Sequence, residues 1–260
     1  MKPIDVHTHL SSTDFDADRP DVVARALETC DAFIDIGSGT SVDAFFKSKK
    51  LAESNEKVFF TAGIHPHDAE ALGLDGETLK AIEEIVKHPK CVAVGECGLD
   101  YHYEHSPKDR QAQVFDWHKK LATRAGLPLM IHTREAEEDT MTMLSQYSGS
   151  AIFHCFTGTK KLADFGVSKG FFVSFSGIVT FKTASDLREI FLNLPIENIL
   201  IETDSPYLAP IPMRGKRNET SFISHTARFL AELRGMPLET FVSATRSNSL
   251  RAFPKLKIQT

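Results

Sequence analysis

Histidine and acidic side chains recur at the ends of short β-branched or aromatic runs. In Asp-Val-His-Thr-His, His7 and His9 are two residues apart, so the alternation of a strand points both imidazoles to the same side. Imidazole is a common metal ligand, although histidine pairs also fill barrel interiors through hydrogen bonds. The pair alone leaves both roles open.

Four other runs end in donors that divalent metals accept. With His7 and His9 they give six nitrogen and oxygen donors, the others being Glu96, His132, His154 and Asp204. Six donors exceed the needs of one catalytic zinc and suit two ions about 3.5–4 Å apart, bridged by a carboxylate. We therefore predict two divalent ions (Mg²⁺, Mn²⁺ or Zn²⁺) bridged by Glu96. Asp204 would share the ion held by His7 and His9, and the second ion would lie on His132 and His154.

Such a centre predicts hydrolysis by a metal-bound hydroxide. Asp204 is the expected catalytic base, and Glu96 is the weaker candidate if it bridges the metals. Asp5 lies two residues before His7, and Glu202 lies two residues before Asp204, so strand alternation points each pair to the same side. Asp5 and Glu202 could therefore orient ligands or add a cation site.

Several residues near these runs could contact a substrate. His65 in GIHPH could donate a hydrogen bond to a phosphate oxygen, or it could be a histidine packed in a loop. The Arg134 guanidinium could bind phosphate through paired hydrogen bonds, or it could be a solvated charge. His67 is a weaker candidate beside His65. A loop after GECGLD could stack bases or seal the barrel mouth, with Tyr101, His102, Tyr103 and His105. A basic loop forms an expected electrostatic rim, with Arg214, Lys216 and Arg217.

The elements that must position these residues alternate regularly. Eight apolar runs alternate with segments of helical period, which predicts βα units; eight units favour a TIM-type (β/α)8 barrel over an open sheet. Helices are expected near 20–29, 41–53, 77–87, 108–125, 135–147, 160–168, 184–193, 219–234 and 238–252. In such a barrel the C-terminal strand ends share one face, where active sites are built.

Composition narrows the class of protein. The 260 residues carry a formal net charge of −5, which argues against a broad basic face for duplex DNA. The four cysteines lack paired spacing and no apolar run approaches the roughly 20 residues of a membrane span. We expect one domain over residues 1–260, a cytoplasmic location and no membrane partner.

Six motifs in order, over nearly the whole chain, resemble the TatD family of metal-dependent DNases: DVHTHL, GIHPH, GECGLDYH, PLMIHTR, FHCFTG and ETDSPYLAP. The resemblance implies the same six metal ligands, a phosphate role for His65, and Mg²⁺-supported 3′ to 5′ exonuclease action on single-stranded DNA ends. One departure is Thr220, where relatives usually have proline, so that loop could differ in shape.

Two other functions remain open from the sequence. The same barrel chemistry serves amidohydrolases, lactonases and phosphotriesterases that act on small molecules. These often use a carboxylated lysine as the bridge, whereas the fourth run here offers Glu96. A noncatalytic, metal-stabilised interaction protein is the third hypothesis, and it would need a closed ligand shell.

Overall fold

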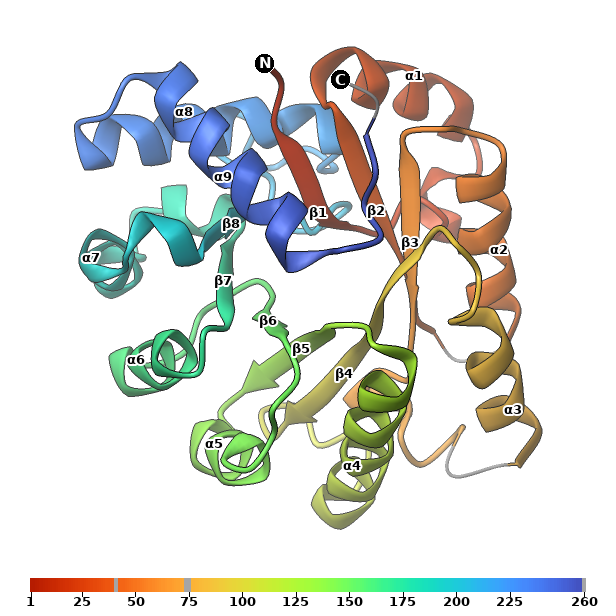
Figure 1. Ribbon diagram of the computed structural model, residues 1–260. Coiled ribbons are helices and arrows are strands. Elements are labelled where there is room, and N and C mark those ends of the chain that lie inside the picture. Colours follow the sequence, from red (N-terminus) through yellow and green to blue (C-terminus); the bar gives the residue numbers. More distant parts are fainter. Residues whose placement is uncertain (40–41, 73–75, 259–260) are drawn as a thin grey trace.

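Eight parallel strands form the centre of the computed structural model, which describes residues 1–39, 42–72 and 76–258. Neighbouring strands pair in chain order from β1 to β8. The strands are β1 (Ile4–Thr8), β2 (Ala32–Gly37), β3 (Val58–Ala62), β4 (Cys91–Asp100), β5 (Leu129–Arg134), β6 (Ala151–Phe153), β7 (Phe172–Phe175) and β8 (Ile199–Ile201). Helices surround them (Figure 1), which confirms the predicted TIM-type barrel.

The helices follow the strands as the sequence pattern predicts. They are α1 (Arg19–Thr29), α2 (Val42–Glu53), α3 (Gly76–Ile85), α4 (Lys108–Ala125), α5 (Glu137–Leu144), α6 (Lys160–Ser168), α7 (Ser185–Asn193), α8 (Ile223–Arg234) and α9 (Leu238–Ala252). The segment expected as one helix near 219–234 begins instead with a short 3-10 turn, Thr220–Phe222. Among the described residues, no helix is both long and apolar enough to cross a membrane.

Two apolar layers hold the barrel together. The inner layer takes residues from every strand and from the end of α9, and it fills the space inside the ring. The outer layer packs the other strand faces against the helices. Met130, Ile152 and Leu200 belong to the inner layer, and His132, His154 and Glu202 lie two residues further along each chain segment. The inner layer therefore continues into a polar cluster at the C-terminal strand ends.

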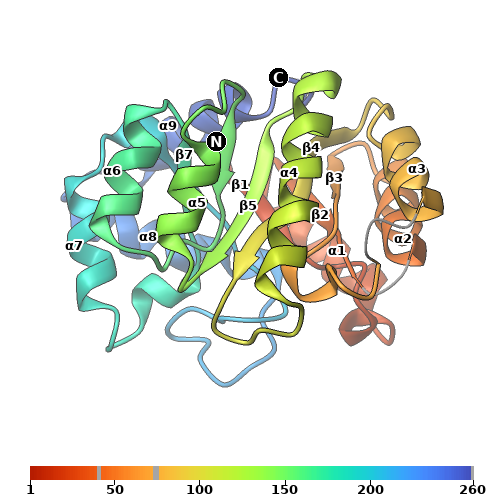
Figure 2. The same cartoon turned by 90° about the horizontal axis from the view of Figure 1, so that it is seen from below.

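The C-terminal strand ends and the loops that follow them form one mouth of the barrel. The long loops after β4 and β8 extend from the same edge in the side view (Figure 2). Two backbone hydrogen bonds join the first and last strands there: Asp204 N donates to His7 O at 2.9 Å, and His9 N donates to Ser205 O at 2.8 Å. Residues nearly 200 positions apart thus become neighbours.

Irregular pairing in β4 explains why its motif contains two glycines. The register against β5 shifts between Val94 and Cys97. Gly98 has φ +135°, and a Cβ there would lie 2.0 Å from the carbonyl oxygen of His132. Only glycine accepts this backbone and this close approach. The bulge carries Glu96 to the mouth.

Candidate metal centre

The mouth gathers all six predicted metal ligands, with His65 beside them. His7 and His132 lie in β1 and β5, and Glu96 lies in β4; the others directly follow strands, namely His9, His65, His154 and Asp204. Apart from His7 and His9, each of them comes from a different part of the ring, so the barrel brings together residues that are far apart in the sequence.

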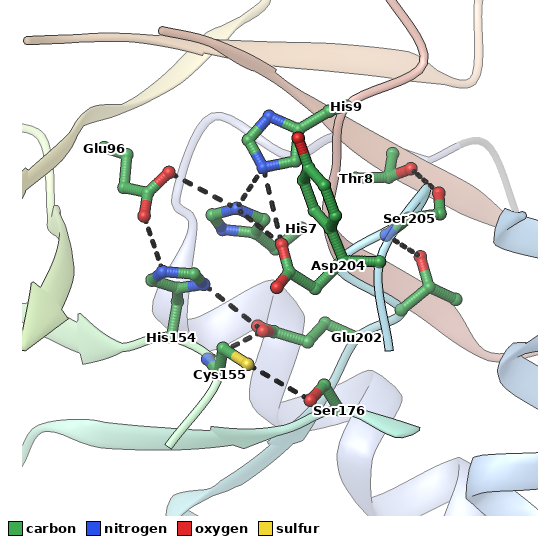
Figure 3. A network of polar contacts seen from close by, with 12 residues as sticks. His7, Thr8, His9, Glu96, His154, Cys155, Ser176, Glu202, Asp204 and Ser205 are labelled. Atoms are coloured by element: carbon green, nitrogen blue, oxygen red, sulfur yellow. Dashed lines mark hydrogen bonds and ion pairs between the residues drawn. The ribbon is translucent and has the colours of Figure 1, made fainter. Parts of the chain in front are cut away.

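Glu96 is the centre of the cluster. Its Oε1 lies 2.7 Å from His154 Nε2, 3.2 Å from His132 Nδ1 and 3.4 Å from His65 Nε2. Its Oε2 lies 3.6 Å from His7 Nε2. One buried carboxylate thus faces four imidazoles and presents both of its oxygens to them, as Figure 3 shows for His7 and His154.

A second group forms on the β1 and β8 side. Asp204 Oδ1 lies 3.4 Å from His9 Nε2 and 3.6 Å from His7 Nε2, and the two imidazole nitrogens are 3.2 Å apart. Asp204 has φ +56°, an uncommon backbone conformation for a residue other than glycine. All five such residues in the described chain follow strands at this mouth: Glu104, Glu135, Cys155, Asp204 and Leu208. Unusual backbone of this kind concentrates at functional sites.

Glu202 lies behind His154. Its Oε1 is 3.3 Å from His154 Nδ1 and accepts the backbone N–H of Cys155 at 2.7 Å (Figure 3). This contact leaves His154 Nε2 directed at Glu96. Glu202 can therefore orient His154, and its buried carboxylate is also close enough to His7 and His154 to share a cation with them.

Asp5 does not lie where strand alternation predicted. The pairing of β1 with β2 shifts between Asp5 and Thr8, so Asp5 and His7 no longer share a side. The Asp5 carboxylate accepts the N–H of His7 at 3.3 Å and both the N–H and hydroxyl of Thr203, at 2.9 and 2.6 Å. Burial raises the pKa of Asp5 to about 7. It fixes the β1 backbone against the segment after β8.

His65 is positioned as a neutral donor. Its Nδ1 accepts the backbone N–H of His67 at 3.1 Å, so the ring proton lies on Nε2, which faces Glu96. Burial lowers the pKa of His65 to about 4, which disfavours the protonated form. The expected phosphate contact would thus use a neutral N–H. Its Nε2 also lies within 4.8 Å of ligand atoms of Glu96 and His132, but a ring nitrogen that carries the proton has no lone pair to offer a metal.

Asp100, which the sequence gave no reason to choose, links two histidines of the mouth. Its Oδ2 lies 2.8 Å from His132 Nε2 and 2.9 Å from His67 Nε2. Its Oδ1 accepts the backbone N–H groups of His102 and Tyr103, each at 3.0 Å. Burial opposes ionisation of Asp100, but the hydrogen bonds from His132, His67 and Tyr103 outweigh it and lower its pKa. His67 is therefore engaged by Asp100. The only sequence signal for Asp100 was its place at the end of the GECGLD motif.

The loop residues expected to contact substrate divide into free and engaged groups. The Arg134 guanidinium lies 4.8 Å over the Tyr103 ring, and no carboxylate in the described part of the chain lies within ion-pair distance of it. Tyr101 donates its hydroxyl to Asp139 at 2.7 Å, and His102 Nδ1 lies 2.6 Å from Glu135.

The basic loop after β8 is partly engaged in the same way. Arg217 pairs with Asp18 at 2.6 Å, while Arg214 lies 3.8 Å over Phe181. Thr220, at the departure from the usual proline, is buried and donates its hydroxyl to Thr8 at 3.1 Å. That hydrogen bond ties the loop to the residue between His7 and His9.

The donor set fits divalent metal. Three groups of imidazole and carboxylate atoms each lie within 4.8 Å of one another, namely His7, His9 and Asp204; His65, Glu96 and His132; and His7, His154 and Glu202. Burial, reinforced by His154, lowers the pKa of His7 well below its ordinary value. Burial alone would raise the pKa of Glu96, but the histidines around it lower it. Neutral imidazole beside ionised carboxylate is the state that metal binding requires, and His7 and Glu96 favour it. Burial opposes protonation of His9, His132 and His154, but the carboxylates near them raise their pKa, so metal binding would displace protons from these three.

Comparisons with known proteins show the family to which the chain belongs. The family model of the TatD related DNases matches residues 4–254. An uncharacterized metal-dependent hydrolase of Bacillus subtilis, YabD, is 38% identical, the match covering 96% of this chain and 98% of the relative. The 3′-5′ ssDNA/RNA exonuclease TatD of Shigella flexneri is 34% identical over 94% of this chain and 96% of its own length.

Solved structures show the same architecture. The crystal structure of YjjV, a TatD homologue from Escherichia coli, superposes with a TM-score of 0.88 at 26% identity, covering 96% of this chain and 97% of that one. An engineered organophosphate-hydrolysing enzyme derived from a lactonase template has a TM-score of 0.68 at 13% identity, which shows a common fold alone.

Fold, site and relatives define a class, that of the metal-dependent hydrolases built on a (β/α)8 barrel. Within that class, the match over residues 4–254 places this chain in the family of TatD related DNases.

Proposed function

We propose that the protein is a metal-dependent nuclease that removes nucleotides from the 3′ end of single-stranded nucleic acid, DNA in the first instance. The observation that carries the proposal is Glu96, a buried carboxylate that faces four imidazoles beside Asp204. The name of the Shigella flexneri relative supports the substrate and the polarity.

The six ligands predicted from the sequence would hold two divalent ions, with Glu96 between them. Bound metal would supply positive charge to a phosphate and would lower the pKa of a water molecule. His7 and His9 approach Asp204 through Oδ1, and we assign acceptance of the water proton to Oδ2. The His65 N–H and the Arg134 guanidinium would hold the phosphate oxygens.

The test uses metal-stripped protein and single-stranded DNA labelled at its 5′ end, with Mg²⁺, Mn²⁺ or Zn²⁺ restored one at a time. We expect a ladder of products shortened from the 3′ end. Asp204→Asn should lower kcat about 10²- to 10⁴-fold, because it removes the base while keeping the shape of the side chain. Asp16→Asn is the matched control; Asp16 pairs with Arg19 on the surface, and its loss should leave kcat unchanged.

Labelled RNA and circular single-stranded DNA define the substrate further. Cleavage of the circle would replace the exonuclease assignment with internal attack. If no metal restores cleavage of any nucleic acid while the protein still binds ions, the nuclease proposal is wrong, and esters, lactones and amides become the substrates to assay.

A further inference from the structure

Two exposed tyrosines flank the candidate metal centre. Tyr103 and Tyr207 keep 51% and 58% of their surface exposed, and the described chain has only one other large aromatic side chain as open, Phe46. Exposed aromatic rings of this size gain from covering by a flat apolar group. Both tyrosines lie at the mouth, where a ligand could cover them. Phe46 lies instead on α2, outside the barrel.

The two rings come from opposite sides of the barrel. Tyr103 follows β4 and Tyr207 follows β8, and these strands are four apart in a ring of eight. Tyr207 contacts His9 edge to face at 6.1 Å, and Tyr103 contacts His67 in the same manner at 5.4 Å. The imidazoles of the centre continue the row between them, with centroid separations of 5.0 Å for His7–His9, 3.8 Å for His7–His154 and 5.7 Å for His132–His154.

Each tyrosine is held in place through its backbone. Tyr103 N donates to Asp100 Oδ1 at 3.0 Å, and Tyr207 N donates to the carbonyl oxygen of Asp204 at 2.9 Å. The carbonyl oxygen of Tyr207 also accepts from Asn218 Nδ2 at 2.6 Å. A backbone fixed before binding loses little entropy when a ligand covers the side chain that it carries.

Charge distinguishes the two sides. Arg134 lies over the ring of Tyr103, which also has the rings of His67, His102 and His105 as neighbours, the last of them parallel at 5.5 Å. A guanidinium beside an aromatic ring suits a base together with its phosphate. On the Tyr207 side the ring neighbour is His9, whose Nε2 lies 3.4 Å from Asp204 Oδ1.

We propose that Tyr103 and Tyr207 are stacking platforms for the two nucleobases on either side of the scissile phosphate, so that the substrate is a strand with a base on each side of the cut. The inference rests on the proposed nuclease function and names the part of the substrate that this site recognises. The chain of nucleotides would continue along the Tyr103 side, on which Arg134 lies.

The test is a double-mutant cycle in which a tyrosine ring and a substrate base are removed singly and together. The substrates are an octathymidylate and two versions in which the terminal or the penultimate 3′ base is replaced by an abasic tetrahydrofuran unit. The variants are Tyr103→Leu and Tyr207→Leu, with Tyr103→Phe and Tyr207→Phe to restore the ring and Phe46→Leu as the matched exposed control. Thermal unfolding checks that each variant is folded.

We expect each missing base to raise KM of the unaltered protein about tenfold, within the range for stacking on an aromatic ring. Each leucine variant should raise KM for the full substrate to a similar extent. In each leucine variant, one of the two abasic substrates should then raise KM less than twofold further. The phenylalanine variants and Phe46→Leu should behave as the unaltered protein does.

Independent effects of side chain and base, with no coupling in either pair, would overturn the stacking assignment while leaving the nuclease function intact. Unchanged KM in both leucine variants would do the same. Failure of the unaltered protein to cleave the octathymidylate with any metal would instead remove the proposed function, and the platforms with it.

Discussion

Asp100 positions several residues of the mouth through hydrogen bonds, although it does not face the centre. By accepting from His132 Nε2, it leaves His132 Nδ1 directed at Glu96, 3.2 Å away. The same oxygen holds His67, and the other oxygen holds the loop that carries Tyr103. Carboxylates behind ligating histidines fix their tautomer and orientation, and their loss usually weakens metal binding 10- to 100-fold.

We predict that Asp100→Asn weakens Mn²⁺ binding about 10- to 100-fold, because an amide nitrogen would oppose the histidine N–H groups. Titration calorimetry on metal-stripped protein measures this directly. Asp139→Asn is the matched control, since Asp139 accepts a hydrogen bond from Tyr101 at the surface and touches no histidine of the centre. Equal affinity in Asp100→Asn and the unaltered protein would show that Asp100 does not position His132.

At the scale of elements, α4 supports the loop after β3 through one buried histidine. His118 accepts the backbone N–H of Ile64 on its Nε2 at 3.0 Å, and its Nδ1 donates to the carbonyl oxygen of Val114 at 2.7 Å. Both ring nitrogens are used only when the ring is neutral. Burial accordingly lowers the pKa of His118 to about 4. Ile64 immediately precedes His65, so α4 sets the position of that donor.

This histidine makes stability depend on pH. An unfolded histidine titrates near 6.5, so between pH 6.5 and 4 the unfolded chain binds more protons than the folded one. The free energy of unfolding should therefore fall as the pH falls through this window, by up to about 3 kcal/mol from this group. His118→Gln keeps an acceptor for Ile64 and does not titrate. Urea unfolding at several pH values should show a shallower decline for the variant; parallel curves would contradict the prediction.

The elements were predictable from the sequence because periodicity is local information. Strand ends then indicated six candidate ligands, which the structure gathers at one mouth because residues after parallel strands share it. The direction of Asp5 could not be predicted, because a shift of pairing between β1 and β2 decides it. The role of Asp100 depends on hydrogen bonds to two other segments, and no spacing within GECGLD encodes those partners. Tyr207 was not singled out either, because its contact is with His9 in another segment, which no spacing within ETDSPYLAP encodes.

At the scale of the whole molecule, we propose that residues 1–260 unfold as one unit, because the inner layer takes side chains from every strand. The apolar core does not depend on metal, whereas the mouth gathers buried carboxylates that a cation would stabilise. A metal ion that binds only the folded chain and is present at 100 times its dissociation constant would contribute about 2.7 kcal/mol.

Removal of metal by a chelator should therefore lower Tm by about 5–10 °C while leaving a single cooperative transition. Scanning calorimetry with and without Mn²⁺ measures both quantities. Two separate transitions would contradict the single unit. An unfolded chelated protein would mean that the metals are part of the core.

The joining of β1 to the segment after β8 sets an order of events during synthesis. His7 and His9 leave the ribosome almost 200 residues before Asp204, and the hydrogen bonds that bring them together need both ends of the barrel. A nascent chain thus carries His7 and His9 without Asp204 for most of its translation, close to messenger RNA and ribosomal RNA. Because Asp204 is the last of the six donors to be synthesised, the candidate centre stays incomplete until nearly the entire barrel has emerged.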